Sequence, residues 1–172
     1  MKRLLLVLGF FATTASAQSR EIVIGSPTLV VDTAAYASGE TIGGLITVTE
    51  ASCPGDMFEI TGAKFADKKL QSITRDITIF KSVPSGTFTD QQATDPADDD
   101  LALAAGPIQV ASGNCFTYSD NTICSVGSLF SPARSTATFN TRRKFYVAIT
   151  TRGADDFDST SDLTLTLYIR CL

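Results

Sequence analysis

Apolar and polar residues alternate along Leu163-Thr164-Leu165-Thr166-Leu167-Tyr168-Ile169-Arg170. Successive side chains of a β-strand point to opposite faces, so this pattern predicts a strand with one face buried and the other in water. Burial on one face alone is typical of antiparallel sheets. The stretch therefore predicts an antiparallel sheet that packs a single apolar face against a core.

The same period of two recurs along the chain. It is clear at residues 76–80 and 145–150, and partial at 45–49; weaker strand signals lie at 21–24, 28–31, 58–65, 107–110 and 135–139. Turn residues separate these segments at short intervals. Helix is nearly absent: residues 98–105 could form a single turn after a long loop over 83–100. The pattern predicts an all-β fold, an antiparallel β-sandwich or jelly roll of about seven to nine strands with little helix.

The N-terminal segment has the features of a secretory signal peptide. Lys2 and Arg3 precede an apolar run, and Ala15-Ser16-Ala17 offers small residues at a cleavage site. The run is shorter than the roughly 20 apolar residues that a membrane-spanning helix needs, so no membrane span is expected. We expect residues 1–17 to be a signal peptide and residues 18–172 to form a single β-sandwich domain, exported to the periplasm or the extracellular space.

The composition excludes several classes of function. Without Lys2 and Arg3 of the predicted signal peptide, 12 basic and 18 acidic residues remain, a net charge of −6, which disfavours binding to nucleic acid. The chain contains no histidine, so a Ser-His-Asp or Cys-His nucleophile and a His-ligated zinc site cannot form. A paired-carboxylate glycosidase stays chemically open. The sequence predicts a protein that is not an enzyme and that carries no cofactor.

Four cysteines, Cys53, Cys115, Cys124 and Cys171, lie after the predicted signal peptide. An even number in an exported protein favours disulfides, and four cysteines allow three connectivities. The local spacing favours a Cys115–Cys124 bridge around the polar segment 116–123, which leaves Cys53 to pair with Cys171. A zinc site of four thiolates is the alternative, but the chain has no Cys-x-x-Cys pair.

The most acidic stretch contains Asp90, Asp95, Asp98, Asp99 and Asp100. Flexible carboxylate loops can bind calcium, and Asp95, Asp98, Asp99 and Asp100 are the candidate ligands. The spacing of a regular calcium loop is missing, so a solvated loop that caps a helix is the favoured interpretation. The acidic segment 154–158 is open to the same two interpretations, a calcium site or a solvated loop.

A few other residues have a predicted structural role. Tyr36 could face a ligand, but a tyrosine beside a tight turn more often packs its ring on the core and bonds its hydroxyl to nearby backbone. Gly43-Gly44 lacks the following lysine of a phosphate-binding loop and instead predicts a bulge or turn with positive φ. We expect the core to include the phenylalanines Phe58, Phe65, Phe80, Phe139 and Phe145.

Several motifs, in order, resemble a family of small virion-associated proteins of tailed phages and prophages. Residues 29–44 contain Asp32-Thr33-Ala34-Ala35-Tyr36-Ala37-Ser38-Gly39-Glu40, similar to the opening Asp-Thr-x-Ala-Tyr-x-x-Gly-Asp of that family. Residues 73–87 resemble its central strand with a Pro-containing loop, and 98–101 its Asp-x-Asp-Leu segment. Residues 145–153 and 162–167 resemble its closing pair of strands.

This resemblance implies a non-enzymatic, β-rich structural protein of the capsid or decoration type, whose partners are proteins through self-association or a larger assembly. It transfers no catalytic residue. The signal peptide and the four cysteines are departures from the family, because virion subunits assemble in the cytoplasm, where disulfides are rare. The alternative from the same residues is an exported bacterial β-sandwich that binds a carbohydrate or a cell-envelope ligand.

Overall fold

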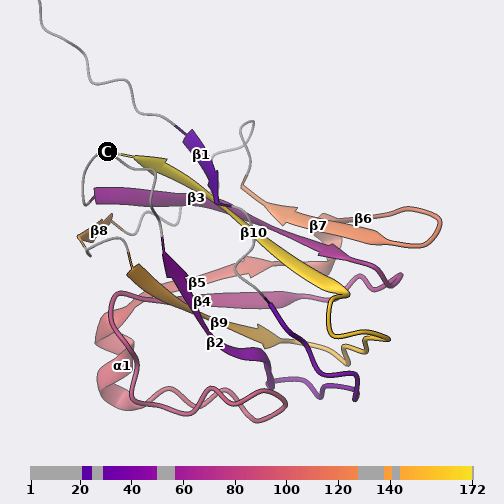
Figure 1. Cartoon of the computed structure of the whole chain (residues 1–172), viewed down its shortest axis with the longest axis horizontal. Helices are drawn as coiled ribbons and strands as arrows, with labels where there is room; N and C mark the ends of the chain where they lie inside the picture. Colours follow the sequence, from indigo (N-terminus) through magenta and orange to yellow (C-terminus); the bar gives the residue numbers. More distant parts are fainter. Residues whose placement is uncertain (1–20, 25–28, 50–56, 128–137, 141–143, 172) are drawn as a thin grey trace, which may run out of the picture.

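The computed structural model describes residues 21–24, 29–49, 57–127, 138–140 and 144–171. These residues form ten strands, one α-helix and one short 3-10 helix (Figure 1). The strands are β1 (Glu21–Ile24), β2 (Thr41–Thr49), β3 (Met57–Asp67), β4 (Arg75–Phe80), β5 (Ala104–Val110), β6 (Cys115–Thr117), β7 (Thr122–Val126), β8 (Thr138–Asn140), β9 (Lys144–Thr151) and β10 (Leu163–Cys171). The helices are α1 (Asp98–Leu103) and η1 (Ser112–Asn114).

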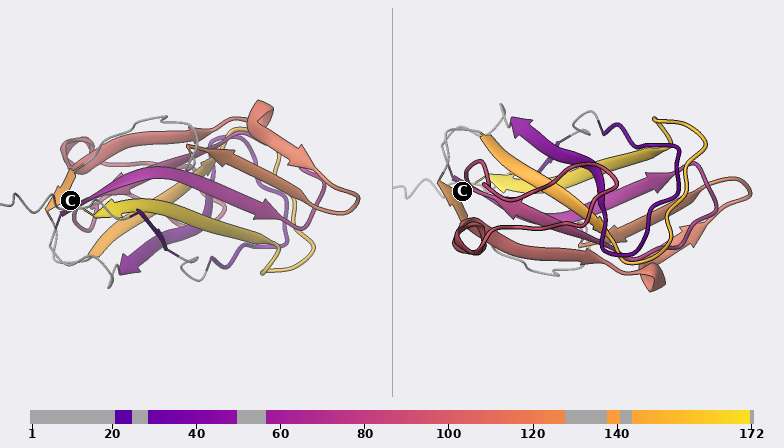
Figure 2. Two further views of the ribbon diagram at one scale, coloured as in Figure 1. Left: turned by 90° about the horizontal axis from the view of Figure 1, so that it is seen from above. Right: turned by 90° about the horizontal axis from the view of Figure 1, so that it is seen from below.

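The strands form two antiparallel sheets that face each other as layers (Figures 1 and 2). One sheet has the order β1-β10-β3-β7-β6, with β8 also paired to β3, and the other has the order β2-β9-β4-β5. The pairs nest along the chain, β1 with β10, β2 with β9, β3 with β7 and β4 with β5. Such a double ribbon wrapped across two sheets is a jelly roll.

The predicted all-β sandwich is therefore confirmed, and the strand order identifies it as the jelly-roll form. Eight strands make the nested ribbon; β6 and β8, each only three residues long, bring the total among the described residues to ten. The eight strands of the ribbon agree with the predicted seven to nine, and β8 overlaps the weak strand signal at residues 135–139. The strand β6 was not predicted, because three residues carry too little periodicity to be seen in a sequence.

The main core lies between the two sheets. Leu163, Leu165, Leu167 and Ile169 of β10 are all at most 2% exposed, which confirms the buried apolar face expected from the alternating stretch. The opposite face is only partly in water, because Thr164 is exposed but Thr166 is 8% exposed. The opposite sheet contributes Phe145, Val147 and Ile149 from β9 and Ile77 and Ile79 from β4. Of the predicted core phenylalanines, Phe65 and Phe145 lie in this core; Phe80 packs in a second cluster, and the side chains of Phe58 and Phe139 are outside the described part.

A third layer covers the outer face of the four-stranded sheet. The long connection from β4 to β5 folds back beneath that sheet and contains α1 (Figure 1). Phe88 of this connection is buried against Phe80 of β4, with ring centroids 5.2 Å apart, and Ala148 of β9 completes the cluster. Because this sheet is covered on both faces, β4 and β9 are buried at nearly every position.

Gly43 and Gly44 form the predicted irregularity in β2. Both have φ of 71°, and the pairing of β2 with β9 shifts register between Ile42 and Ile46. A Cβ on Gly43 would overlap the side chain of Leu29 and lie 3.1 Å from the carbonyl oxygen of Val30. Glycine is required here both by the backbone conformation and by the close approach of a neighbouring segment.

Two sequence interpretations are wrong in detail. In the segment predicted as a strand at residues 28–31, Leu29 and Val31 are buried and Val30 is exposed, yet residues 29–31 are not in a strand. Their apolar alternation reflects an extended loop held by a bond from the Val31 N–H to the Thr160 carbonyl. Conversely, residues 116–123, interpreted as a polar loop, mostly form the hairpin β6–β7.

Within the described ranges, no helix has the length and apolar character needed to cross a membrane. The predicted signal peptide lies outside the described residues.

Removal of the Phe88 ring should destabilise the protein by uncovering the four-stranded sheet. We expect Phe88→Ala to lower the free energy of unfolding by about 3–5 kcal/mol, the usual cost of emptying a buried aromatic site. Val83→Ala is the matched control, because Val83 is 61% exposed in the same connection; it should change stability by less than about 0.5 kcal/mol. Urea unfolding measures both, and equal effects would contradict a packed third layer.

Candidate functional site

An exposed pair of aromatic rings occupies the edge of the six-stranded sheet. Phe116 of β6 is 65% exposed and Tyr118, directly after the strand, is 52% exposed. Their rings contact edge to face with centroids 4.8 Å apart. We call the segment 115–126, which contains β6, the turn 118–121 and β7, the aromatic hairpin. It extends beyond the rest of the sheet in Figures 1 and 2.

A disulfide anchors the base of this hairpin. Cys115 and Cys124 are register partners in β6 and β7, and their sulfurs are bonded at 2.02 Å. Cys124 is fully buried in the main core, so the bridge attaches the edge strand to the interior of the sandwich. The predicted Cys115–Cys124 bridge is confirmed. The second predicted bridge, Cys53–Cys171, stays a prediction, because Cys53 and the side chain of Cys171 are outside the described residues.

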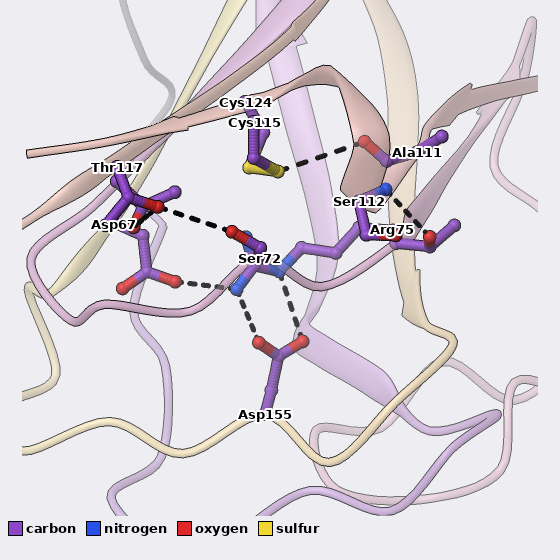
Figure 3. The surroundings of a disulfide bond; sticks show 11 residues. Asp67, Ser72, Arg75, Ala111, Ser112, Cys115, Thr117, Cys124 and Asp155 are labelled. Atoms are coloured by element: carbon purple, nitrogen blue, oxygen red, sulfur yellow. Dashed lines mark hydrogen bonds and ion pairs between the residues drawn. A yellow bond between two sulfur atoms is a disulfide. The ribbon is translucent and has the colours of Figure 1, made fainter.

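The hairpin rests on the segment that leads into β4. The backbone N–H of Ser112 donates to Thr74 Oγ1 at 2.9 Å, and the hydroxyls of Ser72 and Thr117 are 3.4 Å apart. Figure 3 shows this segment between the disulfide and a buried cluster of charges. Residues 72–75 thus support the hairpin on one side and carry Arg75 into the core on the other.

Arg75 is the centre of the buried charge cluster. Its Nη2 donates to Asp67 Oδ2 at 2.7 Å, its Nε donates to Asp155 Oδ2 at 3.1 Å, and Nη2 also bonds Asp155 Oδ1. All three side chains are 0% exposed (Figure 3). Asp67 ends β3, Arg75 starts β4 and Asp155 lies in the β9–β10 connection, so the cluster joins both sheets and a loop.

Aromatic rings complete the surroundings of Arg75. The guanidinium carbon lies 5.4 Å from the centroid of Phe65 and 6.0 Å from that of Phe157. Such contacts partly replace the hydration that burial removes. Nη1 is the one buried side-chain nitrogen or oxygen without a hydrogen-bond partner in the described part of the chain.

The electrostatics of the cluster keep Arg75 charged. Burial acts to lower the pKa of Arg75, but the hydrogen bonds and negative charges of Asp155 and Asp67 raise it overall. Burial raises the pKa of Asp67, against the opposing effects of the Lys69 backbone N–H and of Arg75. A charge cluster this deeply enclosed has no access to a substrate, so its role is to hold the fold.

Tyr36 extends this network to further loops. Its backbone N–H donates to the Asp155 carbonyl at 2.8 Å, and its ring packs edge to face on Phe157. Its hydroxyl accepts from the Asp32 N–H at 2.7 Å and donates to Asp90 Oδ1 at 2.8 Å. Burial raises the pKa of the hydroxyl well above its ordinary value, so it stays a neutral donor. The predicted packing role of Tyr36 is confirmed.

The calcium candidates Asp95, Asp98, Asp99 and Asp100 do not converge on a common point. Asp98 and Asp99 are exposed at the start of α1, whereas Asp100 is 1% exposed and points inward. Nowhere in the described ranges do three or more His, Cys, Asp or Glu side chains come together in a way that could hold a metal ion. In the segment 154–158, Asp156 and Asp158 pair with Lys69 at 2.8 and 2.9 Å.

The carboxylate of Asp100 forms hydrogen bonds within the β4–β5 connection and caps the start of α1. Its carboxylate accepts backbone bonds from Ser85 at 2.7 Å, Gly86 at 2.7 Å and Ala97 at 3.0 Å. Burial of the carboxylate acts to raise its pKa, but these hydrogen bonds outweigh burial and lower it below the ordinary value. The favoured sequence interpretation, a solvated loop that caps a helix, is correct for the capping by Asp100 and wrong for its solvation, because Asp100 is buried while Asp98 and Asp99 are exposed.

A groove runs along β4 and β5 on the outer face of the four-stranded sheet, with a volume of about 330 Å³. Its residues are Asp76, Thr78, Phe80, Pro96, Leu101, Ala104, Pro107 and Arg152. Asp76 is buried at one part of it, where Oδ2 accepts from Arg152 Nε at 2.6 Å and Oδ1 accepts from Gln109 Nε2 at 3.0 Å. The side chain of Arg152 is 52% exposed, so its guanidinium is accessible from the groove.

Sequence reasoning missed both the aromatic pair and the groove. Phe116 and Tyr118 alternate with Thr117 between two cysteines, and a disulfide-closed segment with alternating aromatic residues is a signal for a hairpin. The groove has no such signal, because Leu101 and Arg152 meet only through the folding of three separate segments.

Loss of one carboxylate of the buried cluster should destabilise the fold strongly. Asp155→Asn keeps the shape of the side chain but leaves Arg75 with a single charged partner, and we expect the free energy of unfolding to fall by about 3–5 kcal/mol. Asp156→Asn is the matched control, since that side chain is 57% exposed and pairs only at the surface; it should cost less than about 1 kcal/mol. Similar losses in denaturant unfolding would contradict the central role of the cluster.

The stabilisation by Asp100 should depend on pH. Its pKa is lowered in the folded state, so the ionised carboxylate stabilises the fold above the ordinary aspartate value of about 3.9, and this contribution is lost as the pH falls through the folded value. We expect Asp100→Asn to be destabilised at pH 6 and the difference from the unmodified protein to shrink at pH 3. Urea unfolding at both values tests this, with Asp99→Asn as the exposed control. A difference that stays constant would contradict it.

No protein-family model and no curated protein matches this chain.

Proposed function

We propose that this protein is a non-enzymatic structural subunit that binds other protein copies through the aromatic hairpin. The observation that carries the proposal is the exposure of Phe116 and Tyr118, 65% and 52%, on a strand edge that a disulfide attaches to the core. Large apolar side chains that are exposed together mark interaction surfaces more often than isolated ones do. A rigid anchor also reduces the entropy lost on binding.

The exposed area of the aromatic pair is too small for a tight dimer and fits an assembly of many copies better. A fully covered aromatic side chain buries about 150–250 Å², so two rings at these exposures offer roughly 200–300 Å². A standard stable interface needs about 800 Å² from each partner. A weak contact of this size gains strength when it is repeated through an assembly.

The charged residues favour a structural role over catalysis. The buried carboxylates of Asp67, Asp100 and Asp155 are each engaged by Arg75 or by backbone N–H groups. That of Asp76, which lines the groove, is engaged by Arg152 and Gln109. An active site usually places at least one such group at a cleft with an accessible proton or lone pair. The absence of histidine from the chain adds to this argument.

The fold and the motifs make the subunit similar to a virion-associated protein. Jelly rolls occur in viral capsid proteins, although the same fold also serves lectins, so this support is an analogy at the level of the fold. The Cys115–Cys124 disulfide favours folding in an oxidising compartment. We therefore place the protein outside the cytoplasm, after cleavage of residues 1–17, as an exported relative of that family.

The aromatic pair also favours a second candidate function, the binding of a carbohydrate or a cell-envelope ligand. Each exposed ring gives an apolar face on which a ligand ring can pack. Binding to a glycan array by a protein that stays monomeric would select this function over self-assembly.

Replacement of the aromatic pair should abolish association without loss of stability. We expect Phe116→Ser with Tyr118→Ser to weaken self-association at least about tenfold, as for anchor residues of interfaces, and to leave the unfolding midpoint nearly unchanged. Sedimentation analysis over a range of concentrations measures the association. The control is Val30→Ser with Leu70→Ser, two side chains of similar exposure, 54% and 57%, elsewhere on the surface. A protein that is monomeric at every concentration would refute the proposed subunit.

A further inference from the structure

The aromatic pair borders further outward-facing residues of the six-stranded sheet. In this sheet β10, β3, β7 and β6 lie side by side (Figure 1). Phe116, Ile123 and Ala66 are register partners across β6, β7 and β3. Each of them is next to a core-facing residue in its own strand, so the three side chains point outward together. Phe116 thus continues an apolar row that crosses three strands of one face.

Lys64 lies at the centre of the same face. It stands between two core residues of β3, so its side chain points outward, and its register partners are Ser125 of β7 and Thr166 of β10. Among the described residues Lys64 forms no ion pair, whereas Lys68 and Arg170, near the two ends of β3, each pair with a carboxylate. A lysine packs its aliphatic stem on the protein surface and keeps its ammonium in water. The ammonium of Lys64 is therefore available to an incoming negative charge.

The aromatic ring and the ammonium can contact one small ligand. Lys64 is two strands away from Phe116 and two residues along from the row that contains it. With about 4.8 Å between strands and about 3.4 Å per residue, their Cα atoms are roughly 12 Å apart. A ligand of two or three rings spans that distance. Ser125 is exposed on the strand between them, where its hydroxyl can bond a hydroxyl of the ligand.

We propose that this face binds a saccharide that carries a carboxylate, with a sugar ring on Phe116 or Tyr118 and the carboxylate on the ammonium of Lys64. The inference rests on the second candidate function, the binding of a carbohydrate. It deepens that function because it names the chemical class of the sugar and the residue that selects it.

The geometry of the aromatic pair suits a sugar. The roughly 200–300 Å² that the two rings offer is far below the area of a protein interface, but a ligand of a few rings needs no more. The rings meet at an angle of 65°. One ring can therefore lie beneath the apolar face of a sugar while the other borders its edge. Aromatic side chains beside a few polar groups are typical of small-molecule sites.

The charges of the face favour a ligand with few negative charges. Binding to a polyanion such as nucleic acid needs many lysines or arginines to replace the counterions, and this face offers the ammonium of Lys64 alone without an ion pair among the described residues. Asp120, the exposed carboxylate of the hairpin, lies in the turn, whereas Lys64 lies opposite Ser125 beyond the disulfide. A carboxylate on Lys64 is therefore kept away from Asp120.

Two matched sugars test the inference, a glucuronic acid trisaccharide and the glucose trisaccharide of the same linkage. We expect the unmodified protein to bind the acidic sugar about three- to fivefold more tightly, the strength of an exposed ion pair, and high salt to remove the difference. Lys64→Gln keeps the length of the side chain and should abolish the preference without a change in affinity for the neutral sugar. Isothermal titration calorimetry, at concentrations where the protein is monomeric, measures each affinity.

The matched control is Lys81→Gln. Lys81 is exposed in the β4–β5 connection, outside the six-stranded sheet, so its replacement should leave the preference for the acidic sugar unchanged. Phe116→Ser with Tyr118→Ser should weaken the binding of both sugars at least about tenfold, as for anchor residues.

The outcomes separate this inference from the second candidate function. If the unmodified protein binds both sugars equally, or if Lys64→Gln keeps the preference, the inference is overturned and carbohydrate binding stands. If neither trisaccharide binds but a glycan array shows another ligand, the inference alone fails. If no glycan binds, or if loss of both rings leaves the binding of the two sugars unchanged, the inference and the second candidate function fail together.

Discussion

The buried ion cluster of Arg75, Asp67 and Asp155 is the constraint on which the end of the sandwich depends. A jelly roll brings together strands that are far apart in the chain, and its loops have no sheet partner to fix them. Here a guanidinium from the start of β4 binds a carboxylate from the end of β3 and another from the β9–β10 connection. Tyr36 links the same connection to Asp90. Five separate segments are therefore held by directional bonds in a place where apolar packing alone would specify their positions poorly.

Burial of the charged cluster costs free energy of hydration. Buried ions lose hydration, and their attraction compensates only when the geometry is good and the remaining donors are satisfied. Arg75 meets this condition in part: two carboxylates and two aromatic rings surround the guanidinium, but Nη1 has no hydrogen-bond partner among the described residues. The aromatic hairpin benefits, because residues 72–75 bear both Arg75 and the contacts to the hairpin base.

Periodicity predicted most of the strands, and local chemistry predicted the disulfide between Cys115 and Cys124. The positive φ of Gly43 and Gly44 was also predictable from the glycines themselves, and the packing of Tyr36 from its place beside a tight turn, although its partners Asp90 and Phe157 were not. The cluster around Arg75 was not, since Asp67 and Asp155 are 88 residues apart and no local pattern marks their meeting. The groove was missed for the same reason. The third layer was hidden because the segment 81–97 is polar overall and only Phe88 anchors it to the second cluster.

The placement of the disulfide has a consequence for the edge of the sheet. An edge strand of three residues, with few hydrogen bonds, is ordinarily among the first parts of a protein to open, at a small fraction of the free energy of global unfolding. The bridge joins Cys115 to Cys124, which is paired with Phe65 of β3, the central strand of the sheet. Separation of β6 from its neighbour is therefore limited by a covalent bond. The lifetime of the surface formed by Phe116 and Tyr118 then follows the slow opening of the inner sheet instead of the rapid fraying of a strand end.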